Sequence, residues 1–160
     1  MIKFKNVTAT YSSGSGIFNI SFELKSSDML FLMGPTGSGK STLLKTIYKE
    51  IDIDSGQIYI DNQDISHLEK YKVPLLRRDV GMIFQDFKLI HDRNIFDNIA
   101  LPLQIEGLNA EEIKSKVFDV LDAVQLSGKH NRYPLELSGG EQQRVSIARA
   151  IVKEPKILLA

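Results

Sequence analysis

The apolar and polar residues of the first part of the chain alternate in a way that predicts strands followed by a helix. Residues 2–8 and 17–24 alternate regularly enough to indicate two half-exposed strands. Residues 29–33 are all apolar, which is typical of a strand buried on both faces of a parallel sheet. A helix is predicted from about residue 40 to residue 50, and a further strand over 57–61.

The later pattern predicts a helical region that lies between further strands. A short apolar run at 80–84 indicates a strand. Apolar residues at helical spacing predict an amphipathic helix over 109–126, which begins with an Asn-x-x-Glu capping box. A last helix is predicted over 139–152, and residues 157–160 start another buried strand. We therefore expect an α/β core into which a mainly helical subdomain, residues 86–137, is inserted.

Length and composition narrow the class of protein. A chain of 160 residues is about one domain. Twenty basic and twenty acidic side chains cancel, which argues against a dedicated nucleic-acid-binding protein, and we expect no nucleic-acid partner. Cysteine is absent, so disulfides and thiolate metal sites are excluded. Because neither a signal peptide nor a run of about 20 apolar residues is present, we expect a soluble cytoplasmic domain.

A phosphate-binding loop lies between the apolar run at 29–33 and the helix that follows. Eight residues fit the pattern G-x-x-x-x-G-K-[ST]: Gly34, Pro35, Thr36, Gly37, Ser38, Gly39, Lys40 and Ser41. The glycines let backbone N–H groups point inward at phosphate oxygens, and the helix adds the positive end of its dipole. Lys40 is then expected on the β- and γ-phosphates, and the Ser41 hydroxyl on Mg²⁺. The loop, with Thr42 after it, predicts nucleotide binding.

A second motif, Leu-Ser-Gly-Gly-Glu, opens the last predicted helix. Ser138 and Glu141 have the spacing of a capping box, which accounts for those two residues without any ligand. It does not account for Gly139 and Gly140, because other residues form the first turn of a helix better. Two glycines there are useful where an anion must approach the backbone at the start of the helix.

Together these motifs resemble the nucleotide-binding domain of the ABC ATPases over nearly the whole chain. Leu137, Ser138, Gly139, Gly140 and Glu141 resemble the signature motif of that family, with Glu141 where Gln is commoner. Gln85 is placed like the family's glutamine that senses Mg²⁺ and the γ-phosphate. Tyr11 is placed like the aromatic residue that stacks on adenine.

The resemblance implies a fold and a division of the chain. The fold is α/β, with a phosphate-loop NTPase (RecA-like) core, an N-terminal antiparallel β part and an inserted helical subdomain. Residues 1–160 would form a single nucleotide-binding domain that lacks its C-terminal core strands. Its parts would be 1–85, with the phosphate loop and Gln85, then 86–137, the helical subdomain, and 138–160, with the signature helix and the start of a core strand.

The resemblance also implies an ATPase. In the family, ATP lies between two subunits arranged head to tail, and we expect a homodimer that depends on whether ATP or ADP is bound. Residues 34–42 of one copy would face Ser138–Gly140 of the other across the γ-phosphate. Lys40 and Gln85 are the expected catalytic residues. Ser41 and Gln85 are the expected contacts to Mg²⁺, which arrives with the nucleotide.

The strand at 157–160 continues in the family into an Asp that orders Mg²⁺ and a Glu that polarises the attacking water. Neither is among these residues, nor is the family's γ-phosphate histidine, and His67, His91 and His130 have no spacing that suits its role or a metal site. Phosphoryl transfer depends on positioning and charge, so we expect these 160 residues to bind nucleotide weakly at best and to hydrolyse it very poorly. We also expect exposed apolar edges.

Within the family, the chain resembles the ATP-binding subunit of a bacterial cell-division complex in residues 73–78, 81–86, 92–93 and 97–103. This implies an integral membrane partner that controls cell-wall hydrolysis, and a peripheral position on the cytoplasmic face of the inner membrane. Residues 86–103 resemble the surface that docks on such a partner, with Phe87, Leu89 and Ile90 as candidate contacts; plain packing is an equal alternative for these three. Lipoprotein-releasing and macrolide-export ATPases share much of the pattern and are the alternative function.

Other classes of protein fit the sequence less well. In an interaction module, nucleotide would only gate assembly, and the sequence does not separate this class from a coupled ATPase. A chromosome-organising or repair ABC ATPase needs a long coiled coil, and no sustained heptads separate Ser41 from Leu137. An unrelated phosphate-loop kinase or GTPase leaves residues 137–142 unexplained.

Overall fold

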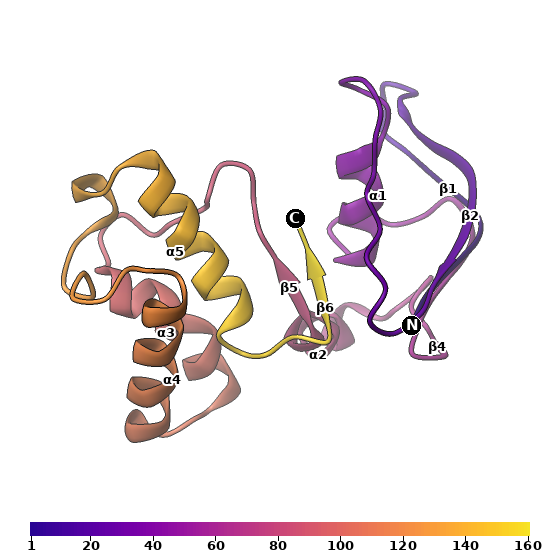
Figure 1. Ribbon diagram of the computed structural model, residues 1–160. Coiled ribbons are helices and arrows are strands. Elements are labelled where there is room, and N and C mark those ends of the chain that lie inside the picture. Colours follow the sequence, from indigo (N-terminus) through magenta and orange to yellow (C-terminus); the bar gives the residue numbers. More distant parts are fainter. The chain divides into compact units, whose positions relative to one another are not determined.

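The computed structural model describes all 160 residues of the chain (Figure 1). The chain divides into two compact units, Met1–Pro74 and Leu75–Ala160, and each unit has its own sheet and its own helices. The short helices η1 (Lys70–Lys72) and α2 (Val73–Asp79) form the connection along the chain. The division into 1–85, 86–137 and 138–160 stays a prediction.

The first unit contains a four-stranded antiparallel sheet in the order β2-β1-β3-β4. The predicted strands at 2–8, 17–24 and 57–61 are confirmed, with slightly different ends. The strands are β1 (Ile2–Thr10), β2 (Gly16–Leu24), β3 (Ser55–Ile60) and β4 (Gln63–Asp64).

A bulge in the middle of β1 explains why its buried residues change from even-numbered to odd-numbered positions. Phe4 is buried before the bulge and Val7 after it, and the register on both neighbouring strands shifts between them. Asn6 in the bulge has a φ of 49°. Gly56 lies opposite, and a Cβ there would be 2.4 Å from the Asn6 carbonyl oxygen, so only glycine fits.

Helix α1 (Lys40–Ile47) lies on one face of this sheet (Figure 1). Its buried residues are Thr42, Leu43, Thr46 and Ile47. Of the apolar stripe expected from the sequence, Leu43 and Ile47 are buried, whereas Leu44 is only half-buried. The helix is shorter than the predicted span of 40–50, because Tyr48 caps it and Lys49 takes a left-handed backbone with a φ of 54°.

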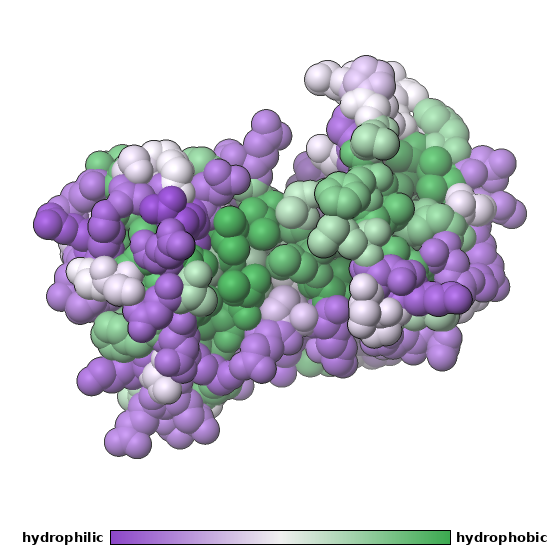
Figure 2. Space-filling model, in the orientation of Figure 1, coloured by the Kyte–Doolittle hydropathy of each residue, from purple (hydrophilic) through white to green (hydrophobic).

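The prediction of a buried strand over 29–33 is wrong. These residues belong to no strand, and their backbone groups are not hydrogen-bonded to any neighbouring strand. Met29, Phe31 and Met33 are 78%, 76% and 91% exposed. Figure 2 shows apolar side chains on the face of the first unit that this segment crosses. A strand buried on both faces needs partners in its own sheet, and an apolar run alone does not supply them.

The second unit contains two parallel strands and a group of helices. Strands β5 (Val80–Met82) and β6 (Ile157–Leu159) confirm the strands predicted at 80–84 and 157–160, although both are shorter. The helices are α3 (Ile95–Glu106), α4 (Ala110–Ala123), the short η2 (Pro134–Glu136) and α5 (Gly139–Ile151).

Helices α3, α4 and α5 enclose one apolar core (Figure 1). Its most deeply buried members are Ile95, Ile99, Ala100, Leu103, Val117, Leu121, Leu126, Val145 and Ala148. The predicted helices at 109–126 and 139–152 are confirmed, with capping boxes at Asn109 and Ser138. None of the helices combines the length and the apolar character needed to span a membrane.

Candidate functional site

The predicted phosphate loop folds around the ammonium group of its own lysine. Lys40 Nζ donates to the carbonyl oxygens of Gly34 and Pro35, each at 2.8 Å, and lies 3.4 Å from the Ser38 hydroxyl. The ion pairs of this unit involve other lysines, so only neutral oxygens surround the Lys40 charge. The loop therefore presents a positive charge that no carboxylate of the chain neutralises.

The start of α1 adds unpaired backbone donors to this charge. The N-cap is Gly39, which has no side chain to cap the helix, and the first hydrogen bond of the helix runs from Leu43 N–H to the Gly39 carbonyl at 2.9 Å. The N–H groups of Lys40, Ser41 and Thr42 have no acceptor within the chain. Three free N–H groups beside an ammonium group favour an anion such as a phosphate.

Close packing against β2 fixes the end of the loop. Gly39 has a φ of 89°, and a Cβ there would lie 2.6 Å from Ile17 Cγ2 and 3.0 Å from the Gly16 carbonyl oxygen. Gly37 also has a positive φ, of 84°, but a Cβ there would meet nothing within 4 Å. Gly39 is therefore required by the packing, whereas Gly37 is required only by the shape of the turn.

Tyr11 lies in the same unit as the phosphate loop. It follows β1 and starts a turn in which its N–H donates to the Ser15 carbonyl and its own carbonyl accepts from Gly14 N–H, both at 2.8 Å. The residue is 39% exposed. Stacking on adenine stays a prediction.

Gln85 lies in the second unit, in an exposed turn three residues after β5. The turn is closed by a hydrogen bond of 3.1 Å from Phe87 N–H to the Phe84 carbonyl. Of the side chains predicted to contact a membrane partner, Leu89 is buried and Phe87 packs against the helical core. Packing therefore accounts for these two, and Ile90 is only half-buried.

The second predicted motif forms the N-terminus of α5. Glu141 Oε2 accepts from the Ser138 N–H at 2.9 Å and from its hydroxyl at 2.8 Å, and the Glu141 carboxylate also pairs with Lys129. Lys129, and after it Ser138, lower the pKa of Glu141 to about 2. Ser138 and Glu141 thus have a local structural role, as the capping-box pattern predicts.

Gly139 and Gly140 have no such role within the chain. A Cβ on Gly139 would meet nothing within 4 Å, and one on Gly140 would meet only Arg144 Nη1 at 4.0 Å. Neither glycine has a positive φ. The start of α5 is therefore an open surface at which something outside the chain can come close to the backbone.

Two polar side chains that the sequence analysis did not select hold the segment after Gln85. Arg149 of α5 donates to the Phe87 and Lys88 carbonyls, each at 2.7 Å. Asn98 of α3 is fully buried, and its side chain makes hydrogen bonds to residues 90, 93 and 94. In both helices the spacing of the apolar residues predicts a core residue at this position, and the sequence has a polar one. A polar side chain at a predicted core position is the signal that could have identified these two residues.

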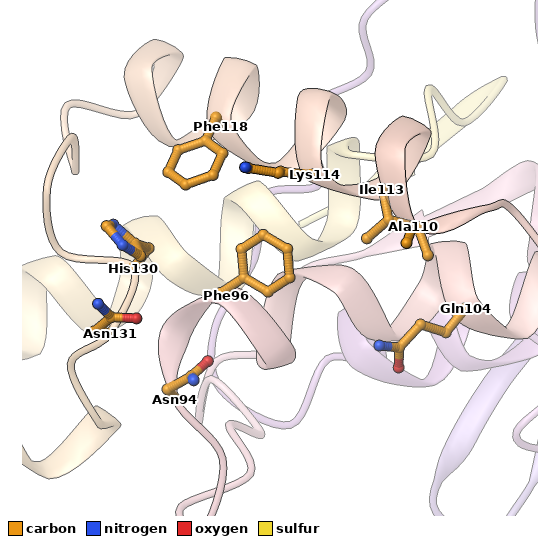
Figure 3. A pocket seen from close by; sticks show the side chains of 9 residues that line it. All are labelled: Asn94, Phe96, Gln104, Ala110, Ile113, Lys114, Phe118, His130 and Asn131. Carbon is orange, nitrogen blue, oxygen red and sulfur yellow. The ribbon is translucent and has the colours of Figure 1, made fainter.

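A cavity of about 420 Å³ opens between α3 and α4 in the second unit (Figure 3). In Figure 3 the rings of Phe96 and Phe118 and the imidazole of His130 lie around it, and Phe118 meets His130 edge to face at 5.1 Å between centroids. None of the predicted nucleotide-binding residues lines this cavity.

The oxygen ligands that the chain offers suit Mg²⁺ only when a nucleotide is bound as well. No group of three or more His, Cys, Asp or Glu residues is placed to hold a metal. Ser41 and Gln85 are both exposed and carry oxygen donors. Mg²⁺ commonly takes one or two protein ligands, several waters and the oxygens of substrate phosphates, so an oxygen donor of either kind suits it, and the two contacts to Mg²⁺ stay a prediction.

Comparison with known proteins gives consistent matches. The family model for ABC transporters matches residues 17–160. The chain is 45%, 42% and 40% identical to the cell division ATP-binding proteins FtsE of Escherichia coli K12, Bacillus subtilis 168 and Streptococcus pneumoniae D39, over all of this chain and 72%, 71% and 70% of theirs. Among solved structures, a dimeric post-hydrolysis state of the ATP-binding cassette MJ0796, bound to ADP and Pi, is similar with a TM-score of 0.91 and 36% identity. That match covers 99% of this chain and 72% of the other.

Proposed function

Since the chain belongs to the ABC transporter family, we propose that it is the ATP-binding subunit of an FtsE-type complex in bacterial cell division. The observation that carries this proposal is its 40–45% identity, over the whole chain, to the FtsE proteins of Escherichia coli, Bacillus subtilis and Streptococcus pneumoniae. The predicted phosphate loop, Gln85 and signature residues all lie within the matched range of the family.

ATP binding is supported by the electrostatics of the phosphate loop. The Lys40 ammonium group is held by two carbonyl oxygens at 2.8 Å and has no carboxylate partner. A triphosphate can take the place of these neutral acceptors and form charge-assisted hydrogen bonds instead. The free N–H groups at the start of α1 add further donors, and Tyr11 provides an exposed ring for the adenine.

Assembly of two copies is supported by the open start of α5. Ser138 and Glu141 complete their own hydrogen bonds within the chain, while Gly139 and Gly140 leave the adjacent space empty. Dimeric cassettes are among the similar structures. We infer a head-to-tail homodimer in which ATP on the phosphate loop of one copy meets the signature residues of the other, and which weakens when ADP replaces ATP.

Each polar residue of the proposed site has a role in ATP hydrolysis by the complex. Lys40 stabilises the charge that develops on the phosphates, Ser41 and Gln85 contact Mg²⁺, and Gln85 links the turn after β5 to the γ-phosphate. Bound Mg²⁺ supplies charge neutralisation at the phosphate oxygens.

The membrane partner is proposed to be an FtsX-like integral membrane protein, with this chain bound peripherally to the cytoplasmic face of the inner membrane. The segment 86–103 is the proposed docking surface. Because Phe87 and Leu89 pack inward, the side chains available for contact in its first part are the exposed Asp86 and Lys88, which pair with each other at 2.6 Å.

Co-purification with the partner tests this function. The chain is expressed with the FtsX-like protein of its own genome and captured in detergent with Mg²⁺ and either ATP or ADP. We expect capture with ATP, loss of capture with Lys40→Ala, and retention with Lys45→Ala, because Lys45 lies on the same helix but pairs with Glu50. Capture only by a lipoprotein-releasing or macrolide-export membrane protein would replace the cell-division function, and capture by none would refute it.

A further inference from the structure

Arg149 grips the backbone of the segment that follows Gln85. Its Nη1 donates to the Lys88 carbonyl and its Nη2 to the Phe87 carbonyl, both at 2.7 Å. The guanidinium group is a rigid planar fork that holds two successive carbonyls in one fixed geometry, whereas a lysine ammonium group is a point charge on a flexible stem. Arg149 stands ten positions after Gly139 on α5, about 15 Å along a helix with a rise of 1.5 Å per residue.

The two residues that Arg149 holds have an uncommon backbone conformation. Phe87 and Lys88 have φ values of 57° and 48°, two adjacent left-handed residues that are not glycine. The Lys88 N–H also donates to the Asp86 carbonyl at 2.6 Å, which tightens the turn. Such a conformation persists where the surroundings hold it, and the Arg149 fork is the contact that reaches both carbonyls.

The far end of the same segment is held by another helix. The Asn98 side chain of α3 accepts from the Ile90 N–H at 2.8 Å and donates to the Ile90 carbonyl at 3.0 Å. Ile90 is therefore fixed to α3, whereas Phe87 and Lys88 are fixed to α5. A shift of α5 relative to α3 must deform the segment between these two attachment points.

We propose that Arg149 is a positioning residue that couples the signature end of α5 to residues 86–90. When a nucleotide on a second copy engages Ser138–Gly140, α5 moves as a rigid helix, and the Arg149 fork carries Phe87 and Lys88 with it. The state of the nucleotide is thereby passed to the turn with Gln85 and to the proposed docking surface. This inference rests on the proposed function, because it needs ATP-dependent pairing of two copies.

Because the sequence contains no cysteine, one cysteine can be introduced beside Arg149 as a single labelling site. Lys88→Cys, labelled with a trifluoromethyl group, gives one ¹⁹F resonance whose position follows the segment. The spectra are recorded on the whole 160-residue chain with Mg-ADP and with Mg-ATP. ATP binding is measured on the same samples by calorimetry.

The variants separate coupling from folding. Arg149→Leu removes the fork, and Arg149→Lys keeps the charge but replaces the rigid fork with an ammonium group on a flexible stem. Lys153→Met is the matched control, because Lys153 lies just after α5 and also donates to two backbone carbonyls, those of Arg77 and Val80. We expect an ATP-specific shift in the parent and in Lys153→Met, a reduced shift in Arg149→Lys, and none in Arg149→Leu, with ATP affinity unchanged throughout.

The outcomes distinguish the coupling from the proposed function. Sedimentation of the same samples shows whether two copies pair. If the parent binds no ATP, or binds ATP without pairing, the proposed function fails and the coupling fails with it. If the parent binds ATP and pairs without a shift, or if both Arg149 variants shift as the parent does, the proposed function stands and the coupling is overturned. Should Arg149→Leu not fold by circular dichroism, the comparison of Arg149→Lys with Lys153→Met decides the result.

Discussion

Glu141 and Ser138 bind each other through three contacts at the start of α5. The Glu141 carboxylate accepts both the backbone N–H and the hydroxyl of Ser138, at 2.9 and 2.8 Å, and the Glu141 N–H lies 3.4 Å from that hydroxyl. Lys129 pairs with the same carboxylate. The residues that open the signature helix are thus organised before any second copy arrives.

This arrangement predicts that Glu141 stabilises the fold in a pH-dependent way. Lys129 and Ser138 lower the pKa of Glu141 from 4.5 to about 2, so the folded state favours the ionised carboxylate. Its contribution is fully present above the unfolded pKa and is lost as the pH falls from 4.5 towards 2. Thermal unfolding of the parent and of Glu141→Gln should therefore differ most near neutral pH and converge in acid. A difference in Tm that persists unchanged at pH 2 would contradict this account, and Glu111→Gln is the control, because Glu111 is exposed on α4.

The two glycines of the phosphate loop should differ in their tolerance of alanine. Gly37→Ala costs about 1 kcal/mol, because its only penalty is a left-handed backbone. Gly39→Ala has the same penalty and in addition places a Cβ 2.6 Å from Ile17 Cγ2, so its cost is about 3 kcal/mol. Urea unfolding of both variants measures this difference. Equal losses would mean that contact with β2 does not fix the loop.

Gly140→Ala should separate folding from assembly. The new Cβ would meet only Arg144 Nη1 at 4.0 Å, and alanine forms helix better by up to about 1 kcal/mol, so stability stays the same or rises. The methyl group would occupy the surface at which the nucleotide of a second copy is proposed to bind. Sedimentation with Mg-ATP should therefore show loss of the dimer. A variant that dimerises like the parent would argue against the signature contact.

Asn98 should be among the most costly polar residues to remove. Asn98 is fully buried, and Asn98→Ala removes the partner of the N–H and carbonyl groups of the half-buried Ile90, so we expect the free energy of unfolding to fall by about 2–4 kcal/mol. Asn131→Ala is the control, because Asn131 is exposed, and it should change stability by less than about 0.5 kcal/mol. Chemical denaturation of both variants provides the measurement.

The sequence predicts local features of this chain better than long-range ones. The capping boxes at Asn109 and Ser138 need only residues three positions apart, and both form as expected. The apolar run at 29–33 does not form the predicted strand, because a strand depends on neighbours that the run itself does not specify.

The contacts that hold the candidate site have the same long-range character. The hydrogen bonds from Arg149 to Phe87 and Lys88 join residues about sixty positions apart, and no local pattern encodes them. The phosphate loop is the opposite case. Its residues are contiguous, so the motif places Lys40 at the start of a helix directly, although its contacts with Gly34 and Pro35 come from the structure.

Titration of ATP into the chain tests the central claim most directly, namely that residues 34–41 bind a triphosphate. Calorimetry with Mg-ATP is carried out on the parent, on Lys40→Ala and on Lys45→Ala. We predict that Lys40→Ala weakens ATP binding about 10- to 100-fold, the loss expected for charge-assisted hydrogen bonds, while Lys45→Ala binds like the parent. Equal affinity of Lys40→Ala and the parent would contradict the account.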